Sequence, residues 1–312
     1  MTILYSKNFD EFVNKVSLYL HEFIRISNND SINFNNLQIN NSFLNLQINT
    51  KYKGEVNIDK IDFIWFNGGK IGFNDIQGKN LKLNQLLYQN YLLLFENFIK
   101  IECNEKLGIL NNNLECNKID VLLLAKKNGF FIPDTLFTKD RNELQKFIKT
   151  HEKAGVISKR IGEQTFFIED TSVYNFANTF EITNTVLLKI PKKFGLTQFQ
   201  EKIVKKFEIR VVYFNRQCYS MAIYSQEMDY RINLNSGKNI RMIPYKLSKI
   251  HEKMVINLMS QFNMSIGSLD FIMDLDDNLY LIEINQCGQI EFLNNHCNYY
   301  LDFDVASFIK RY

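Results

Sequence analysis

Two short apolar runs near the C-terminal end of the chain carry three oxygen-bearing side chains. The first run, residues 267–274, contains Asp270, and the second, residues 279–285, contains Glu283 and Asn285. If the Asp-rich link between them is a tight turn, the runs form a β-hairpin in which Asp270 lies opposite Glu283. Asn285 is two residues further along and therefore shares their face. Two carboxylates and an amide on one face are suitable ligands for a hard cation such as Mg²⁺.

The residues beside these polar positions favour a hairpin that packs on a core. Leu269 and Phe271 flank the first carboxylate, and Ile282 and Ile284 flank the second. Their side chains are expected to point to the opposite face, into apolar packing. Mg²⁺ would complete its coordination with water and nucleotide phosphates, and two ions could share Glu283 as a bridge. The alternative is a solvated hairpin whose carboxylates pair with nearby lysines.

The composition disfavours several other classes of protein. The 312 residues are 46% hydrophobic, which is enough for one large core or several small ones, and the net charge is only +3. The charges are interspersed, so neither a nucleic acid nor a membrane is indicated as a partner. Five cysteines without a Cys-x-x-Cys pair and four scattered histidines disfavour disulfides and zinc. Because no signal peptide or membrane span is visible, we expect a cytoplasmic protein.

The first third of the chain shows an α/β pattern. A short strand is predicted at residues 3–6 and an amphipathic helix at residues 10–24. A strand at residues 61–66 ends at a turn signal, and a long helix is expected over roughly residues 80–103.

From about residue 118 the pattern changes to α+β with a mainly antiparallel sheet, so a domain boundary is expected just before Lys118. Three helices are predicted, at residues 120–128, 143–149 and 249–262. The predicted strands that precede the hairpin lie at residues 155–161, 165–168, 186–190, 208–214 and 219–225.

With these elements in place, the sequence resembles the ATP-grasp superfamily. In that superfamily an Asp and a later Glu-x-Asn supply the magnesium ligands, which here are Asp270, Glu283 and Asn285. The resemblance implies that Lys118 reaches the ATP phosphates and that Lys159 also touches the nucleotide. Taken singly, each of these lysines would more often be a solvated surface residue.

Two further segments match the superfamily. Residues 199–203 resemble the hinge that binds adenine, which assigns Gln200, Glu201 and Ile203 to the nucleotide. The backbone groups of Glu201 and Ile203 would make the hydrogen bonds. Arg210, in the strand that follows, matches the arginine that faces the transferred phosphoryl group.

Within the superfamily the sequence is most similar to graspetide synthetases, the microviridin-ligase-like enzymes, and especially to peptide maturases of grasp-with-spasm systems. The resemblance covers roughly residues 118–305 and rests on a string of motifs in the C-terminal half. These are Ser225-Gln226, Asp229-Tyr230-Arg231, Arg241 to Leu247, Gly267-Ser268-x-Asp270, Glu283-Ile284-Asn285-x-x-Gly288-Gln289 and Cys297 to Leu301.

Three positions depart from these relatives. Asn67 and Gly68 stand where the relatives tend to carry arginines, so a substrate role of the N-terminal domain is not implied. Gln286 stands where they usually carry proline. That change should loosen the backbone after the metal ligands without removing a ligand.

The resemblance implies a multidomain fold of the α/β and α+β classes, the ATP-grasp fold. An N-terminal α/β (pre-ATP-grasp) domain would occupy residues 1–114, and two α+β subdomains would enclose the nucleotide. The central subdomain would span residues 115–200, and the C-terminal subdomain with the metal site would span residues 201–312.

The implied reaction is an ATP-dependent ligation, with ATP and two Mg²⁺ ions as cofactors. The γ-phosphoryl group moves to a carboxylate, and a hydroxyl or an amine then attacks the acyl phosphate. Arg210 would stabilise the phosphoryl transition state, and Arg231 would hold the substrate carboxylate or acyl phosphate. A surface salt bridge is an equally good interpretation of Arg231.

The substrate that the resemblance implies is a ribosomal precursor peptide, whose Asp or Glu side chains are joined to Ser, Thr or Lys and whose leader binds away from the active site. Two alternatives stay open: a ligase that adds an amino acid to a peptide or protein, and a catalytically silent ATP-binding or peptide-binding partner of a modifying complex. A homodimer and a partner modifying protein of the same gene cluster also stay open. The aromatic segment 298–301 is expected in the core rather than at a dimer contact.

Overall fold

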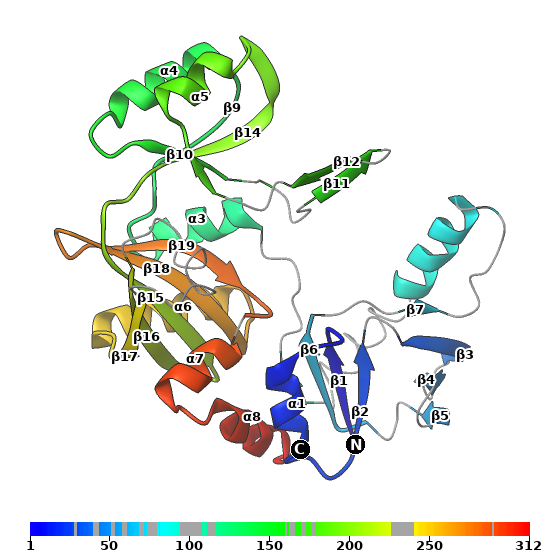
Figure 1. Cartoon of the computed structure of the whole chain (residues 1–312). Helices are drawn as coiled ribbons and strands as arrows, with labels where there is room; N and C mark the ends of the chain where they lie inside the picture. The colour runs from blue at the N-terminus through cyan, green and yellow to red at the C-terminus, as the bar shows by residue number, and fades with distance from the viewer. Residues whose placement is uncertain are drawn as a thin grey trace.

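A computed structural model gives the fold of the chain (Figure 1). No helix in the part of the chain that it describes is long and apolar enough to cross a membrane. The described residues are 1–27, 30–39, 44–50, 54–57, 61–68, 72–73, 80, 82–93, 108–110, 117–159, 161, 166–169, 172–175, 179–225, 240–288 and 290–312.

The chain begins with a parallel sheet, which confirms the expected α/β beginning. Its described strands are β1 Thr2–Ser6, β2 Phe23–Ser27, β6 Phe63–Asn67 and β8 Gly108–Leu110, in the order β2-β1-β6-β8. The helix α1, Glu11–Ser17, connects β1 to β2. It begins after Asp10 because the Asp10 carboxylate accepts a hydrogen bond from the N–H of Val13.

The helix predicted over residues 10–24 is wrong in its second half. α1 ends at Ser17, and Phe23 and Ile24 belong to β2, where they pair with β1. Sheet pairing overrides the local helical spacing there. Residues 82–93 are helical, within the helix predicted over residues 80–103, whose last ten positions lie outside the described residues.

A second sheet lies in the N-terminal third, with the strand order β5-β4-β3-β7. It is antiparallel except where β7 joins β3. The strands are β3 Ser31–Ile39, β4 Leu44–Thr50, β5 Gly54–Asn57 and β7 Gly72–Phe73.

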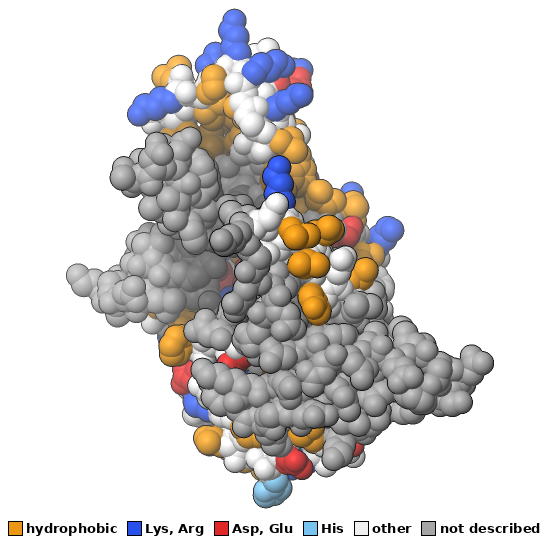
Figure 2. All heavy atoms as spheres, turned by 90° about the vertical axis from the view of Figure 1, so that its right-hand side faces the viewer, with side chains coloured by type: hydrophobic (Ala, Val, Ile, Leu, Met, Phe, Trp, Pro, Cys, Tyr) orange, Lys and Arg blue, Asp and Glu red, His pale blue; other side chains and the backbone are white. Residues whose placement is uncertain are grey.

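An antiparallel unit, here called the central unit, stands at one end of the molecule (Figure 1). Its strands are β9 Thr135–Asp140, β10 Val156–Lys159, β13 Phe180–Glu181 and β14 Lys193–Glu201, in the order β13-β10-β14-β9. Its helices are α4 Arg141–Thr150 and α5 Asn184–Lys189, and the hairpin of β11 Phe166–Glu169 and β12 Ser172–Asn175 projects beside it. Seen from the side, its surface carries many Lys and Arg side chains, with hydrophobic side chains gathered below it (Figure 2).

The strand predicted over residues 186–190 is wrong. This segment lies mostly in α5, which begins after Thr183 because the Thr183 hydroxyl accepts a hydrogen bond from the N–H of Val186. A short apolar run fits a strand or a helix equally well, and here the cap decides between them.

The C-terminal part contains an antiparallel sheet in the order β17-β16-β15-β18-β19. The strands are β15 Lys205–Phe214, β16 Gln217–Ser225, β17 Ile240–Tyr245, β18 Ile266–Asp274 and β19 Leu279–Asn285. The helices are α3 Lys118–Lys127, α6 Lys249–Gln261, α7 Ile290–Cys297 and α8 Leu301–Ile309. The antiparallel α+β pattern and the predicted C-terminal hairpin are thereby confirmed.

Three groups of buried side chains hold these units. One face of the C-terminal sheet packs against α3 and α6. The other face packs against α7 and α8, and this core continues through α1 into β1 and β6 of the N-terminal sheet. The central unit has a smaller core of its own around Leu144 and Phe199. Tyr299 packs against the second of these cores, as expected, whereas Tyr300 is 70% exposed.

Candidate active site

The buried Arg210 and the partly exposed Asp270 form an ion pair at the centre of the C-terminal sheet. They are register partners on β15 and β18, so their side chains project from the same face. Arg210 Nε donates to Asp270 Oδ1 at 2.7 Å, and Nη2 donates to Oδ2 at 2.8 Å. The Arg210 side chain is only 3% exposed, and its guanidinium lies 6.0 Å from the ring centroid of Phe292 in α7. The pair is therefore a pre-oriented charged group beneath a helix.

The hairpin places Glu283 opposite Asp270, as the sequence predicts. A β-bulge interrupts the ladder there: Phe271 pairs with Leu281 while Asp270 pairs with Glu283, so Ile282 is an extra residue. The predicted burial of Ile282 beside Leu269, Phe271 and Ile284 is therefore wrong. Leu281 takes its place in the core, and Ile282 is half-buried outside the core.

Asn285 connects the two carboxylates. Its amide Nδ2 donates to Glu283 Oε1 at 3.1 Å and approaches Asp270 Oδ2 at 3.5 Å. This arrangement turns the amide nitrogen toward the carboxylates and gathers three oxygen-bearing side chains, all partly accessible, on one face. The donor set fits Mg²⁺, which prefers a few carboxylate or amide oxygens and keeps water in its shell.

The end of the N-terminal sheet reaches the loop that follows these ligands. Asn67 is 2% exposed and donates to Asp10 at 2.8 Å. Gly68, with φ of +75°, lies so close to Cys287 that an added Cβ would be 3.2 Å from its Sγ. Of the two residues that depart from the relatives' arginines, Asn67 is bonded within the N-terminal part, and Gly68 packs against the loop that follows Asn285.

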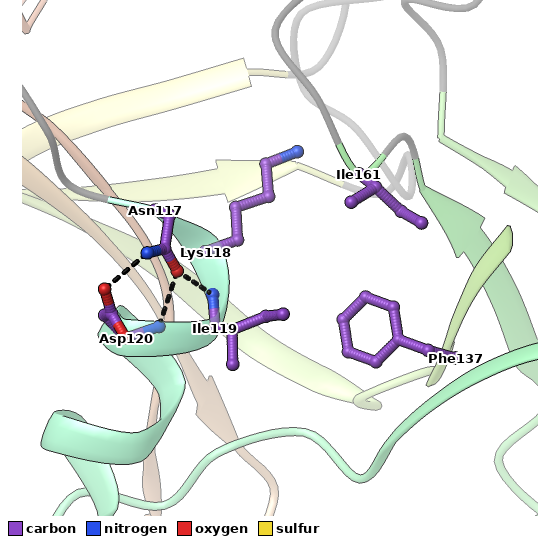
Figure 3. A pocket seen from close by; sticks show the side chains of 6 residues that line it. All are labelled: Asn117, Lys118, Ile119, Asp120, Phe137 and Ile161. Atoms are coloured by element: carbon purple, nitrogen blue, oxygen red, sulfur yellow. Dashed lines mark hydrogen bonds between the residues drawn. The ribbon is translucent and has the colours of Figure 1, made fainter. Parts of the chain in front are cut away.

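A pocket of about 280 Å³ opens at the start of α3 (Figure 3). Lys118 lines it together with Ile119, Phe137 and Ile161, whose side chains face a common space. Asn117 caps the helix, since its Oδ1 accepts from the N–H groups of Ile119 and Asp120 at 3.0 and 2.9 Å. One predicted nucleotide lysine therefore lies in a hollow with an apolar wall, which suits part of a nucleotide.

The other predicted nucleotide residues lie on adjacent strands of the central unit. Lys159 pairs with Gln198 in the ladder between β10 and β14, and Gln200 and Glu201 follow on β14. Gln200 is buried, and its Nε2 donates to Thr135 Oγ1 at 2.9 Å. The Glu201 N–H donates to the Asp134 carbonyl at 3.0 Å, so this N–H is already occupied. Ile203 is half-buried in the link to β15.

Arg231 lies outside the described residues, so its predicted role stays a prediction. Sequence reasoning missed Phe292, Phe137 and Ile161, because single hydrophobic residues carry no local mark of a site. It also missed the cluster of Asp134, His151 and Glu201, which comes from three separate segments.

A sequence profile of the RimK-like ATP-grasp domain matches residues 115–309, more than half of the chain. The chain belongs to the RimK-like ATP-grasp family. The resemblance and the ATP-grasp fold predicted from the sequence are confirmed, and the predicted metal ligands Asp270, Glu283 and Asn285 lie inside the matched region. A search of curated proteins gave no match.

Solved structures share the fold over the whole chain, including the N-terminal third. The macrocyclase MdnC of Microcystis aeruginosa MRC, bound with precursor peptide MdnA, is 19% identical with a TM-score of 0.80 over 100% of both chains. A RiPP-associated ATP-grasp ligase of Chryseobacterium gregarium, in complex with ADP and a leader and core peptide, is 23% identical with a TM-score of 0.81. That match covers 99% of this chain and 96% of the other. The ligase PsnB, complexed with minimal precursor, Mg and ADP, is 12% identical with a TM-score of 0.71 over 99% and 96%.

Proposed function

We propose that this ATP-grasp protein is an ATP-dependent ligase that crosslinks a ribosomal precursor peptide. It activates Asp or Glu side chains of the peptide as acyl phosphates, and Ser, Thr or Lys side chains of the same peptide attack them to form esters or amides. The observation that carries the proposal is the Arg210–Asp270 pair with Glu283 and Asn285 on the same face. Full-length likeness to ligases solved with precursor peptides supports the choice of substrate.

The proposed roles follow from charge and geometry. Asp270, Glu283 and Asn285 would hold one or two Mg²⁺ ions, which neutralise phosphate charge when bound. Arg210 is fixed by two hydrogen bonds and therefore needs little reorganisation to stabilise charge on a transferring phosphoryl group. We assign Arg231 to the substrate carboxylate or the acyl phosphate, because a guanidinium binds either group with two hydrogen bonds.

Lys118 and Lys159 are assigned to the nucleotide phosphates, and the segment from Gln200 to Ile203 is assigned to the adenine. The pocket beside Lys118 supports the first assignment. In the second assignment, the N–H groups of Glu201 and Lys202 already donate to Asp134 and Gly155, so the N–H of Ile203 is the proposed donor to the adenine. Residues 1–114 are proposed as a separate domain, and the chain from residue 115 as the two subdomains around ATP.

The test uses purified protein with ATP, Mg²⁺ and the small peptide encoded beside its gene, and measures ADP release and peptide mass. Loss of whole waters from the peptide in wild type but not in Glu283→Gln supports the crosslinking ligase. Asp276→Asn is the matched control, since Asp276 is an exposed carboxylate in the turn of the same hairpin.

Two outcomes would replace the proposal. ADP release with a gain of peptide mass would indicate a ligase that adds amino acids. ATP binding without peptide-dependent ADP, for every candidate peptide, would indicate a silent partner of a modifying complex.

A further inference from the structure

The chain crosses twice between the central unit and the C-terminal sheet. The first crossing, residues 128–134, leads from α3 to β9, and the second, residues 202–204, leads from β14 to β15. The two units have separate cores on either side of these crossings. The crossings are therefore the natural hinge between the units.

The two crossings are bonded to each other where they enter the central unit. The N–H of Asp134 donates to Glu201 Oε1 at 3.0 Å, and the N–H of Glu201 donates to the Asp134 carbonyl at 3.0 Å. This reciprocal pair ties the start of β9 to the end of β14. It fixes the backbone at Glu201, within the segment that we assign to the adenine.

The ring of His151, at the C-terminal end of α4, lies between the carboxylates of both partners of this pair. Its Nδ1 lies 3.4 Å from Glu201 Oε2, and its Nε2 lies 3.5 Å from Asp134 Oδ2. The imidazole is 11% exposed and packs on Phe147 with a centroid distance of 4.6 Å. Each ring nitrogen faces a different carboxylate, so the ring bridges the two crossings.

Backbone hydrogen bonds also connect His151 to the second crossing. The carbonyl of His151 accepts from the N–H of Gly155 at 2.8 Å, and the carbonyl of Gly155 accepts from the N–H of Lys202 at 3.0 Å. Lys202 also pairs with Glu181 at 2.8 Å. The turn after α4 therefore anchors the second crossing through backbone hydrogen bonds, and Glu181 of β13 adds an ion pair to it.

We propose that His151 is a positioning residue of the nucleotide site: by bridging Asp134 and Glu201 it fixes the hinge segment against which the adenine binds. This inference rests on the proposed nucleotide-binding function. Small displacements of positioning groups are costly, because the site must present its hydrogen-bonding groups in one geometry. Without the imidazole, Glu201 Oε2 loses its contact with the ring and only Oε1 stays bonded, to the N–H of Asp134. The segment 201–204 is then less firmly held.

The test compares His151→Ala and His151→Gln with wild type, and uses the exposed His21→Gln as the matched control. ADP affinity is measured by calorimetry, kcat and the KM for ATP by ADP release, and backbone order by hydrogen exchange at residues 201–204. We expect His151→Ala to weaken ADP binding and raise KM by roughly tenfold, with kcat within about twofold of wild type. Exchange should rise at residues 201–204, and His151→Gln should recover part of the affinity because its amide can still donate to Glu201.

Unchanged ADP affinity and unchanged hydrogen exchange in His151→Ala would overturn the inference. A fall in kcat together with a fall in melting temperature would also overturn it, because it would indicate a general loss of structure. The three side chains also present ligand atoms within 4.8 Å of one another. A melting temperature that zinc raises in wild type but not in His151→Ala would make the cluster a metal site instead. If wild type binds ADP but never consumes ATP with a peptide, the proposed ligase activity fails while the hinge inference is still tested by calorimetry.

Discussion

The guanidinium of Arg210 donates two hydrogen bonds, of 2.7 and 2.8 Å, to the carboxylate of Asp270 on the adjacent strand. The residue assigned to the phosphoryl group and a residue assigned to the metal are thus one structural unit. Neither side chain can be moved without changing the other, and the guanidinium also lies 6.0 Å from the ring centroid of Phe292. Charge and position are set before any ligand arrives.

Arg210→Ala should reduce both stability and catalysis. It leaves the Asp270 carboxylate, 22% exposed, without its main partner, at a cost of about 2–3 kcal/mol in the free energy of unfolding. Urea titration measures this cost. Arg210→Lys keeps the charge but not the paired geometry, so we expect a fall in kcat of about 100-fold or more with a smaller stability loss. Wild-type turnover by Arg210→Lys would contradict a role in phosphoryl transfer.

Glu283→Gln should raise the Mg²⁺ concentration required for ADP formation while leaving the fold intact. The substitution removes a charged ligand but keeps an oxygen that can accept from Asn285, the contact present at 3.1 Å. Rates measured across a Mg²⁺ titration give the half-saturation point, and chelation by EDTA should abolish the wild-type rate. An unchanged titration curve for Glu283→Gln would place the metal elsewhere. Asp276→Asn should behave as wild type.

Gly288→Ala should disrupt the loop that follows the metal ligands. An added Cβ would lie 2.2 Å from the Oγ of Ser268, which is fully buried and is the register partner of Asn285. We expect a loss of about 1–3 kcal/mol in the free energy of unfolding and a reduced rate. Ser268→Gly in the same chain should restore part of both, because only the backbone contact at 3.0 Å then remains.

The matched control for this overpacking is Gly195→Ala, since nothing lies within 4 Å of an added Cβ at Gly195. It should unfold at the urea concentration of wild type. Equal losses in Gly195→Ala and Gly288→Ala would show that the effect comes from replacing glycine in general and not from contact with Ser268.

Lys118→Ala should raise the KM for ATP by about 10- to 100-fold, the range expected for removing a charged hydrogen-bond donor from a phosphate. Its position in the lining of the pocket beside Ile119 is the reason for this expectation. Lys126→Ala is the control, because Lys126 is exposed on the same helix. Steady-state kinetics at varied ATP concentration compares the two variants. Equal KM values for ATP in Lys118→Ala and Lys126→Ala would show that Lys118 does not bind the phosphates.

Much of the geometry of the proposed metal site follows from the sequence because its residues are close along the chain. A tight turn between two alternating apolar runs brings Asp270 opposite Glu283 and leaves few other registers. The helices α4 and α6 were likewise predictable, since caps and 3.6-residue spacing are local signals. The ATP-grasp fold was identified through the order of such local motifs.

The tertiary structure alone decided which distant segments meet. The contact between Arg210 and Asp270 joins residues 60 positions apart, and the bulge at Ile282 shifts the core partner from Ile282 to Leu281. The end of α1 and the helical state of α5 were also set by sheet pairing and a cap rather than by apolar spacing. Local periodicity indicates only which face of an element a side chain occupies. Which residue it contacts on another segment depends on the free energy of strand pairing and core packing between segments that are distant in the sequence.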